Sequence, residues 1–188
     1  HDIGSLDLRS LRKNIGLVMQ DVFLFNGTIR SNIALKNPDI SDDDIQRSIE
    51  LANASKFINN LQSGLNSEVA EKGATFSSGE RQLLSFARAL AIKPSMFALD
   101  EATANIDTET ERLIQDALAK MIKNKTGIIV AHRLSTIRHC DKIIVLHKGR
   151  VKEIGDHQSL LAKKDFYYNL YKLNYNCYFT ISNNSTSN

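Results

Sequence analysis

Several residue types are scarce in this sequence, and each shortage excludes a class of protein. The 188 residues include no tryptophan and only two cysteines, Cys140 and Cys177, which lie far apart and outside any zinc-binding spacing. This pattern favours reduced thiols in a cytosolic protein over a structural disulfide. No apolar run approaches the about 20 residues needed to span a bilayer, and residues 1–5 lack the features of a signal peptide. The chain itself is therefore expected to have no transmembrane segment.

Dense blocks of charge are also missing. The formal net charge is +3, and no run of lysine and arginine stands out, which argues against nucleic acid or an anionic membrane surface as the main partner. With 42% hydrophobic and 24% charged residues, the composition is that of a soluble chain with a sizeable core in one or two globular units. No nucleic-acid partner is expected.

The most informative stretch of the chain is an apolar run that ends in two acids. Met96–Leu99 has the length and apolarity of a strand buried on both faces, so Asp100 and Glu101 would emerge at its carboxyl end. Open α/β sheets place their ligand crevice at that edge. Asp100 is suited to hold Mg²⁺, and Glu101 to orient or deprotonate a water that attacks a phosphoryl group. The alternative is an ordinary strand followed by a solvated acidic turn.

Two further strand patterns end in polar residues. Residues 15–19 read as a short strand that delivers Gln20, which is suited to bind the metal ion or the water, although an ordinary loop glutamine is the alternative. Residues 127–130 read as a second buried strand that delivers His132 next to Glu101, if the two strands are parallel neighbours. A structural histidine is the alternative there.

The region between these strands reads as helical. Ser41 is a plausible helix N-cap, and apolar residues follow it at helical spacing, so residues 28–73 are expected to form a helical subdomain inserted into an α/β core. Next, Ser77, Ser78 and Gly79 open a helix whose first N–H groups are suited to bind phosphate. The alternative is a serine N-cap without a ligand. No Gly-x-x-x-x-Gly-Lys-Ser/Thr phosphate loop occurs anywhere in the 188 residues.

The last third of the chain predicts three more elements. Asp107 or Thr108 would cap a helix with one apolar face. Residues 142–146 and 150–154 read as a hairpin with a glycine turn, which gives the sheet an antiparallel edge. A final helix would begin near Asp156, and the polar segment 174–188 is expected to be disordered.

With these residues in view, the sequence resembles the nucleotide-binding domain of an ATP-binding cassette (ABC) exporter of the multidrug or lipid type, over residues 1–173. Several motifs of that family occur in the expected order. They are the glutamine loop at Gln20, the signature loop at Phe76, Ser77, Ser78, Gly79 and Glu80, the Walker B strand at residues 96–100, the D-loop at residues 104–107 and the switch histidine at His132.

The resemblance implies a function and partners. It makes Glu101 the catalytic base, with His132, in ATP hydrolysis that drives export across a membrane, with ATP and Mg²⁺ as cofactors and Asp107 near the nucleotide. It also implies docking to a transmembrane domain through residues 20–25 and 67–73, at the cytoplasmic face of the membrane. The expected fold is the α/β P-loop NTPase core with a parallel sheet, an inserted helical subdomain and an edge hairpin.

Two departures from the family pattern matter. Ser78 and Glu80 stand where the family's Leu-Ser-Gly-Gly-Gln signature has glycine and glutamine, which resembles heterodimeric exporters with one altered site. The Walker A loop, the first strand and the amino-terminal β-subdomain would precede His1, so we expect the chain alone to be inactive. Two alternatives remain: a non-enzymatic remnant or regulatory fragment of an ABC protein, and a soluble ABC ATPase that is not involved in transport.

Overall fold

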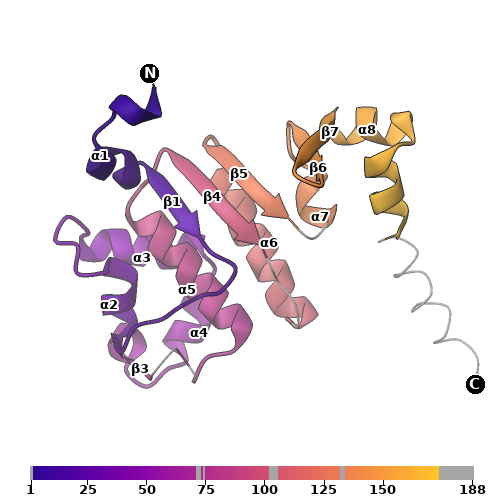
Figure 1. Ribbon diagram of the computed structural model, residues 1–188. Coiled ribbons are helices and arrows are strands. Elements are labelled where there is room, and N and C mark those ends of the chain that lie inside the picture. Colours follow the sequence, from indigo (N-terminus) through magenta and orange to yellow (C-terminus); the bar gives the residue numbers. More distant parts are fainter. Residues whose placement is uncertain (1, 71–72, 74, 102–105, 132–133, 174–188) are drawn as a thin grey trace, which may run out of the picture. The chain divides into compact units, whose positions relative to one another are not determined.

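The computed structural model describes residues 2–173 except 71–72, 74, 102–105 and 132–133 (Figure 1). The chain divides into two compact units, His1–Val130 and Ala131–Asn188, which we describe separately. Within the described part of the chain, no helix is both long and apolar enough to cross a membrane.

The first unit is built on a parallel sheet of three strands, in the order β1 (Ile15–Val18), β4 (Met96–Glu101) and β5 (Thr126–Ala131). β1 pairs with β4 in parallel, from Ile15 opposite Met96 to Val18 opposite Leu99. Figure 1 shows β5 running in the same direction as β1. The strands that end at Glu101 and Ala131 are therefore parallel neighbours, which is the condition for bringing His132 close to Glu101.

The two faces of this sheet differ in burial. Val18, Phe97 and Leu99 are buried in the main core, because the alternation of a strand sends them to the same face. On β5, Ile128 and Val130 are 55% and 56% exposed, so the prediction of a second buried strand at residues 127–130 is wrong. Ile129 packs against the core, and its two neighbours point to the opposite face, which stays open in the described part of the chain.

Helices cover the buried face and form the inserted subdomain. The long helices are α5 (Ser78–Ala91) and α6 (Thr108–Ile122), which contact each other. The shorter elements are η1 (Ile3–Ser5), α1 (Leu8–Lys13), α2 (Ile29–Ala34), α3 (Asp42–Leu51), α4 (Ser55–Asn59), η2 (Gly64–Asn66) and the antiparallel pair β2 (Gly27–Thr28) and β3 (Glu68–Val69). Ser41 caps α3 as predicted, since its hydroxyl accepts a hydrogen bond from the N–H of Asp44.

The second unit contains α7 (Leu134–Ile137), the hairpin of β6 (Ile143–His147) and β7 (Arg150–Gly155), α8 (His157–Lys163) and a helical segment at residues 166–173. Lys148 and Gly149 both have positive φ, as a tight hairpin turn requires. α8 begins directly after Asp156, where the sequence predicts the start of the final helix, and Asp156 caps it. The hairpin strands pair with each other as a separate two-stranded sheet.

Candidate functional site

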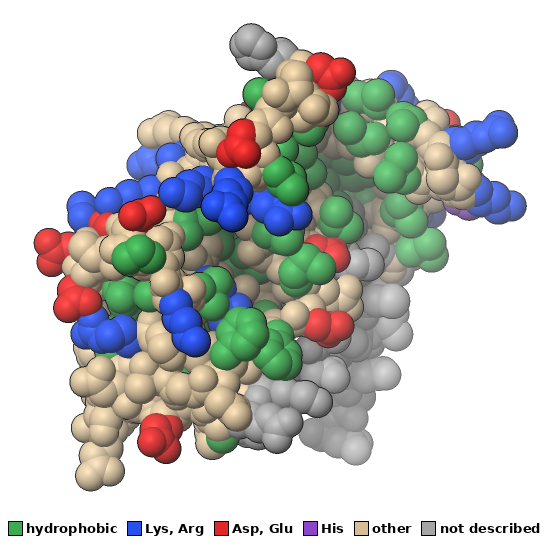
Figure 2. All heavy atoms as spheres, turned by 60° about the vertical axis from the view of Figure 1, so that its left-hand side comes forward, with side chains coloured by type: hydrophobic (Ala, Val, Ile, Leu, Met, Phe, Trp, Pro, Cys, Tyr) green, Lys and Arg blue, Asp and Glu red, His purple; other side chains and the backbone are tan. Residues whose placement is uncertain are grey.

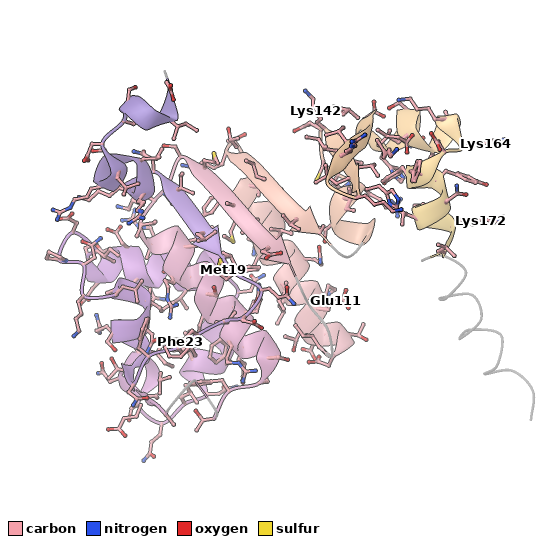
Figure 3. The ribbon with its side chains drawn as sticks, in the orientation of Figure 1. Met19, Phe23, Glu111, Lys142, Lys164 and Lys172 are labelled. Atoms are coloured by element: carbon pink, nitrogen blue, oxygen red, sulfur yellow. The ribbon has the colours of Figure 1, made fainter. Side chains whose placement is uncertain are left out.

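The parallel pairing of β1 and β4 brings two predicted site residues to the same edge of the sheet. Val18 is opposite Leu99, so the residues that follow each of them emerge at neighbouring strand ends. Asp100 is half-buried there, and Gln20 is exposed two residues beyond the end of β1. Figure 3 labels Met19 at this end of β1. An oxygen-rich pair at the carboxyl edge matches the ligand chemistry of Mg²⁺, which is commonly held by one or two carboxylates together with substrate phosphates.

Close approach at Gly16 fixes how β1 lies against β4. A Cβ atom at this position would lie 2.7 Å from the ring of Phe97 and 2.8 Å from Cγ of Pro94. Glycine therefore lets the two strands meet where a larger residue would separate them. The position of Gln20 relative to Asp100 depends on this contact.

The structure describes only part of the two residues that are predicted to be catalytic. Glu101 is the last residue of β4 and directly follows Asp100. β5 ends at Ala131, directly before His132, which lies outside the described residues. The roles of both side chains therefore stay predictions.

The signature loop forms the amino-terminal end of α5, with a complete capping box. The hydroxyl of Ser77 accepts a hydrogen bond from the N–H of Glu80 at 3.2 Å, and Glu80 Oε2 accepts one from the N–H of Ser77 at 2.8 Å. The carboxylate of Glu80 is therefore folded back onto the loop. The N–H groups of Ser78 and Gly79 belong to the first helical turn, where the helix supplies no carbonyl partner. They are the groups best placed to donate to an anion.

Packing against α6 and α4 supports this loop. A Cβ atom at Gly79 would collide with Thr110 and lie 3.5 Å from Ile106, so α5 and α6 meet closely at their amino-terminal ends. Asp107 caps α6, and its pKa is lowered chiefly because the N–H of Thr110 donates to it. Phe76 is buried, with its ring centroid 6.2 Å from that of Phe57.

The direction of α5 places the signature loop on the same side as the strand ends. α5 contacts β1 and ends at Ala91, a few residues before β4 begins. Its amino-terminal end therefore points toward the carboxyl edge of the sheet, as Figure 1 shows. The first unit thus presents two candidate groups in that direction: carbonyl and carboxylate oxygens at the strand ends and N–H donors at α5.

The residues expected to meet a transmembrane domain also come together. The β2–β3 pair joins residues 27–28 to residues 68–69, and a Cβ atom at Gly73 would lie 2.7 Å from Leu24. A hollow of about 600 Å³ lies between residues 23–26 and the end of α2, and it is bordered by Phe23, Phe25 and Leu35. All three side chains are about half exposed. Figure 2 shows hydrophobic side chains at the surface of the face turned toward the viewer.

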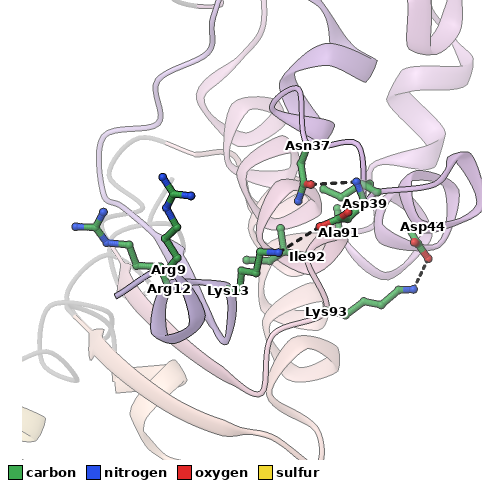
Figure 4. A pocket seen from close by; sticks show the side chains of 10 residues that line it. Arg9, Arg12, Lys13, Asn37, Asp39, Asp44, Ala91, Ile92 and Lys93 are labelled. Atoms are coloured by element: carbon green, nitrogen blue, oxygen red, sulfur yellow. Dashed lines mark hydrogen bonds and ion pairs between the residues drawn. The ribbon is translucent and has the colours of Figure 1, made fainter. Parts of the chain in front are cut away.

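A second hollow, of about 440 Å³, contains none of the predicted site residues. It lies between α1, the start of α3 and the end of α5, and it is lined by basic side chains including Arg9 and Arg12 (Figure 4). Two of its cations are paired with carboxylates: Lys13 with Asp39 at 3.3 Å, and Lys93 with Asp44 at 2.7 Å.

Sequence reasoning missed the polar contacts behind the first hollow. Arg88 donates three hydrogen bonds to Asn32 and Phe23, and Asn32 is almost fully buried. The only signal in the sequence is that both polar residues interrupt otherwise apolar helix faces. Thr110, which contacts Gly79, was missed as well, because a threonine in a first helical turn is unremarkable.

Comparison with known proteins shows the family of this chain. The ABC transporter family matches residues 1–104. The chain belongs to the ABC transporter family. The ABC transporter ATP-binding protein exp8 of Streptococcus pneumoniae, itself described as putative, is 50% identical over 172 residues, covering 92% of this chain and 29% of that protein. An ATP-dependent lipid A-core flippase of Syntrophus aciditrophicus is 45% identical over 175 residues, covering 93% of this chain and 29% of that protein.

The solved structures agree with the sequence relatives. A bacterial Atm1-family ABC exporter with ATP bound matches with a TM-score of 0.84 and 37% identity, over 93% of this chain and 30% of that one. The predicted α/β ABC fold is thus confirmed. This ABC chain spans under a third of the length of each of these relatives.

Proposed function

We propose that this chain is the ATP-hydrolysing part of an ABC exporter, in which ATP hydrolysis drives the movement of a substrate across a membrane. The observation that supports the proposal is the parallel pairing of β1 and β4, which ends both strands at one edge of the sheet, in a chain 45% identical to an ATP-dependent flippase. Gln20 and Asp100 follow the paired residues of these two strands. Membrane attachment would come from a transmembrane partner that meets residues 20–25 and 67–73.

Each residue at the strand ends has a role in this proposal. Asp100 would hold Mg²⁺, directly or through water, and Gln20 would contact the same ion or the attacking water. When bound, Mg²⁺ neutralises the charge that develops on the phosphate oxygens. Glu101 would accept the proton of the water as its oxygen bonds to the γ-phosphorus and the bond to the leaving ADP oxygen breaks. His132 would donate a hydrogen bond to the transferred phosphoryl group.

Substitutions of the two acids in the transporter that carries this chain test these roles. Glu101→Gln keeps the shape of the side chain but removes the base, so hydrolysis should fall by about 10²–10⁴ while nucleotide binding stays largely intact. Asp100→Asn should instead weaken Mg²⁺-dependent nucleotide binding. Steady-state ATPase rates near the parental value in both variants would show that the site assignment is wrong.

The 188-residue chain by itself should bind MgATP weakly and not turn it over. A phosphate loop normally supplies a nest of N–H groups and a lysine for the β- and γ-phosphates, and these residues contain no such motif. Micromolar binding of MgATP to the isolated chain in a calorimeter would contradict this expectation.

The altered signature loop leads us to propose that the chain works in an unequal pair. In a head-to-tail dimer, the signature loop of this chain serves the partner's nucleotide; the loop consists of Phe76, Ser77, Ser78, Gly79 and Glu80. Glu101 and His132 serve the nucleotide bound by this chain itself. Glu80 accepts a hydrogen bond from the N–H of Ser77, so its negative charge lies at the helix end whose N–H groups we propose as phosphate donors. A repulsion of about 1 kcal/mol would lower phosphate occupancy several-fold there.

Restoring the family residues tests the unequal pair. The double variant Ser78→Gly and Glu80→Gln should accelerate ATP hydrolysis at the partner's site. Blocking the catalytic glutamate of each domain in turn shows which of the two sites is accelerated. A large acceleration of the site that contains Glu101 itself would contradict the head-to-tail assignment.

A further inference from the structure

The loop that follows Gln20 exposes two aromatic rings without regular secondary structure to support them. We call residues 21–26 the docking loop. Phe23 is 51% and Phe25 53% exposed, and their rings meet edge to face with centroids 5.0 Å apart. Leu24, between them, is fully buried and anchors the loop on the core. A loop that presents apolar side chains in a defined arrangement needs its main chain held in place.

Arg88 of α5 supplies much of that support. Its Nη1 donates to the carbonyl oxygen of Phe23 at 3.0 Å, and its Nε donates to the carbonyl oxygen of Asn32 at 2.9 Å. Its Nη2 donates to Asn32 Oδ1 at 3.2 Å. The guanidinium carbon also lies 5.8 Å from the centroid of the Phe25 ring. Only the planar, forked guanidinium can reach these acceptors together, which the single ammonium of a lysine cannot do.

Asn32 of α2 completes the support. Its side-chain oxygen accepts the N–H of Phe25 at 2.8 Å, and its side-chain nitrogen donates to the carbonyl oxygens of Phe25 at 2.8 Å and Thr28 at 3.0 Å. Asn32 is 1% exposed, so these bonds are shielded from water. The docking loop is therefore held at residues 23 and 25 by main-chain contacts that do not depend on which side chains it carries.

The helix that carries Arg88 also carries the signature loop. Arg88 lies ten residues after Ser78, the first residue of α5, a distance of about 15 Å along the helix axis. Most residues between them are buried, and Gly79 is packed tightly on Thr110 at the other end. α5 therefore connects the docking loop to the nucleotide-facing end of the unit as one packed element.

We propose that Arg88 is a positioning residue that fixes the docking loop to α5, and that displacement of the loop by a docked partner reaches the signature loop through this residue. The assignment of a partner rests on the proposed function. The attachment of the loop to α5 does not.

Amide hydrogen exchange on the full 188-residue chain tests the attachment directly. In Arg88→Gln, the N–H of Phe25 should exchange about ten- to a hundredfold faster, because Asn32 Oδ1 and the loop carbonyl lose their charged donor. The N–H groups in the middle of α5 should keep their protection. Arg47→Gln is the matched control, since the side chain of Arg47 is exposed and its hydrogen bonds go to Asp43 and Asp44 of its own helix, α3. It should leave the exchange of Phe25 unchanged.

The outcomes separate a positioning role from a purely stabilising one. Equal acceleration throughout α2, α3 and α5 would show that Arg88 only stabilises the unit and would overturn the proposal, as would unchanged exchange at Phe25. If Arg88→Gln does not fold, Arg88→Lys serves instead, because it keeps the charge and one bond. In Arg88→Lys, the N–H of Phe25 should exchange faster than in the parent chain, but more slowly than in a chain that has lost every bond from residue 88.

A kinetic measurement in the transporter tests the coupling. Arg88→Lys should lower kcat for ATP hydrolysis while changing KM for ATP less than about twofold, because the residue does not touch the nucleotide. A rise in KM that accounts for the whole loss would overturn the coupling. The exchange experiment needs neither ATP nor a partner, so its result does not depend on whether the proposed ATPase function holds.

Discussion

Replacing Gly16 with alanine probes the contact that sets the relative position of the site strands. The added Cβ atom would lie 2.7 Å from two ring carbons of Phe97 and 2.8 Å from Cγ of Pro94, both of which are buried. Neither ring is the flexible end of a long side chain, so β1 or β4 must shift. Overpacking of this kind costs about 1–3 kcal/mol of the free energy of unfolding.

A second substitution tests whether the cost comes from this contact. Phe97→Leu removes ring atoms in the place where the new methyl group would sit, so the pair Gly16→Ala and Phe97→Leu roughly conserves volume. The cost of the double variant should be at least about 1 kcal/mol smaller than the sum of the single costs. Gly4→Ala is the matched control, because its Cβ atom would lie 3.4 Å from Asp2 Oδ1 in an exposed turn. Its effect should stay within about 0.5 kcal/mol.

The free energy of unfolding of the first unit is best followed through the slowest-exchanging amides of α5, because the chain divides into two compact units and these amides belong to the first. A cost for Gly16→Ala below about 0.5 kcal/mol, or strictly additive costs in the double variant, would refute the overpacking argument. The position inferred for Gln20 beside Asp100 would then lose its structural explanation.

Two further predictions concern the helical subdomain. Hydrogen bonding to Lys93, then to Ser41, lowers the pKa of Asp44 from 3.8 to about 2, so the folded state holds the charged form more strongly than the unfolded chain. The contribution of the Asp44–Lys93 pair to the free energy of unfolding is therefore present above pH 3.8 and lost as the pH falls toward 2. Because Lys93→Gln removes this contribution, the acid-unfolding curve of the variant should be flatter in that window. Asn53 has φ 56° and bonds to Leu113 and Asp116 of α6, so Asn53→Gly should cost about 1–2 kcal/mol in urea unfolding, and Asn53→Ala about 1 kcal/mol more. Equal costs for the two variants would show that the backbone conformation contributes nothing.

Sequence patterns alone determined the local features of this protein. The N-cap at Ser41, the start of the last helix at Asp156 and the positive φ of Gly149 in the hairpin turn occur where the sequence predicts them. Each is satisfied by a hydrogen bond or a dihedral angle within a few residues, so the information is local. The order of polar residues at strand ends likewise predicts the edge of the sheet at which the candidate site lies, because parallel strands share their carboxyl edge.

Only the tertiary structure decided the contacts between distant segments. The bonds from Arg88 to Asn32 join residues 56 positions apart, and the close approaches of Gly16 to Phe97 and of Gly79 to Thr110 depend on how strands and helices pack. The exposure of Ile128 and Val130 likewise depends on which elements cover the sheet, and an apolar β-branched run reads the same way whether one face or two are buried. Such contacts arise from packing many side chains at once, and no short window of sequence contains both partners.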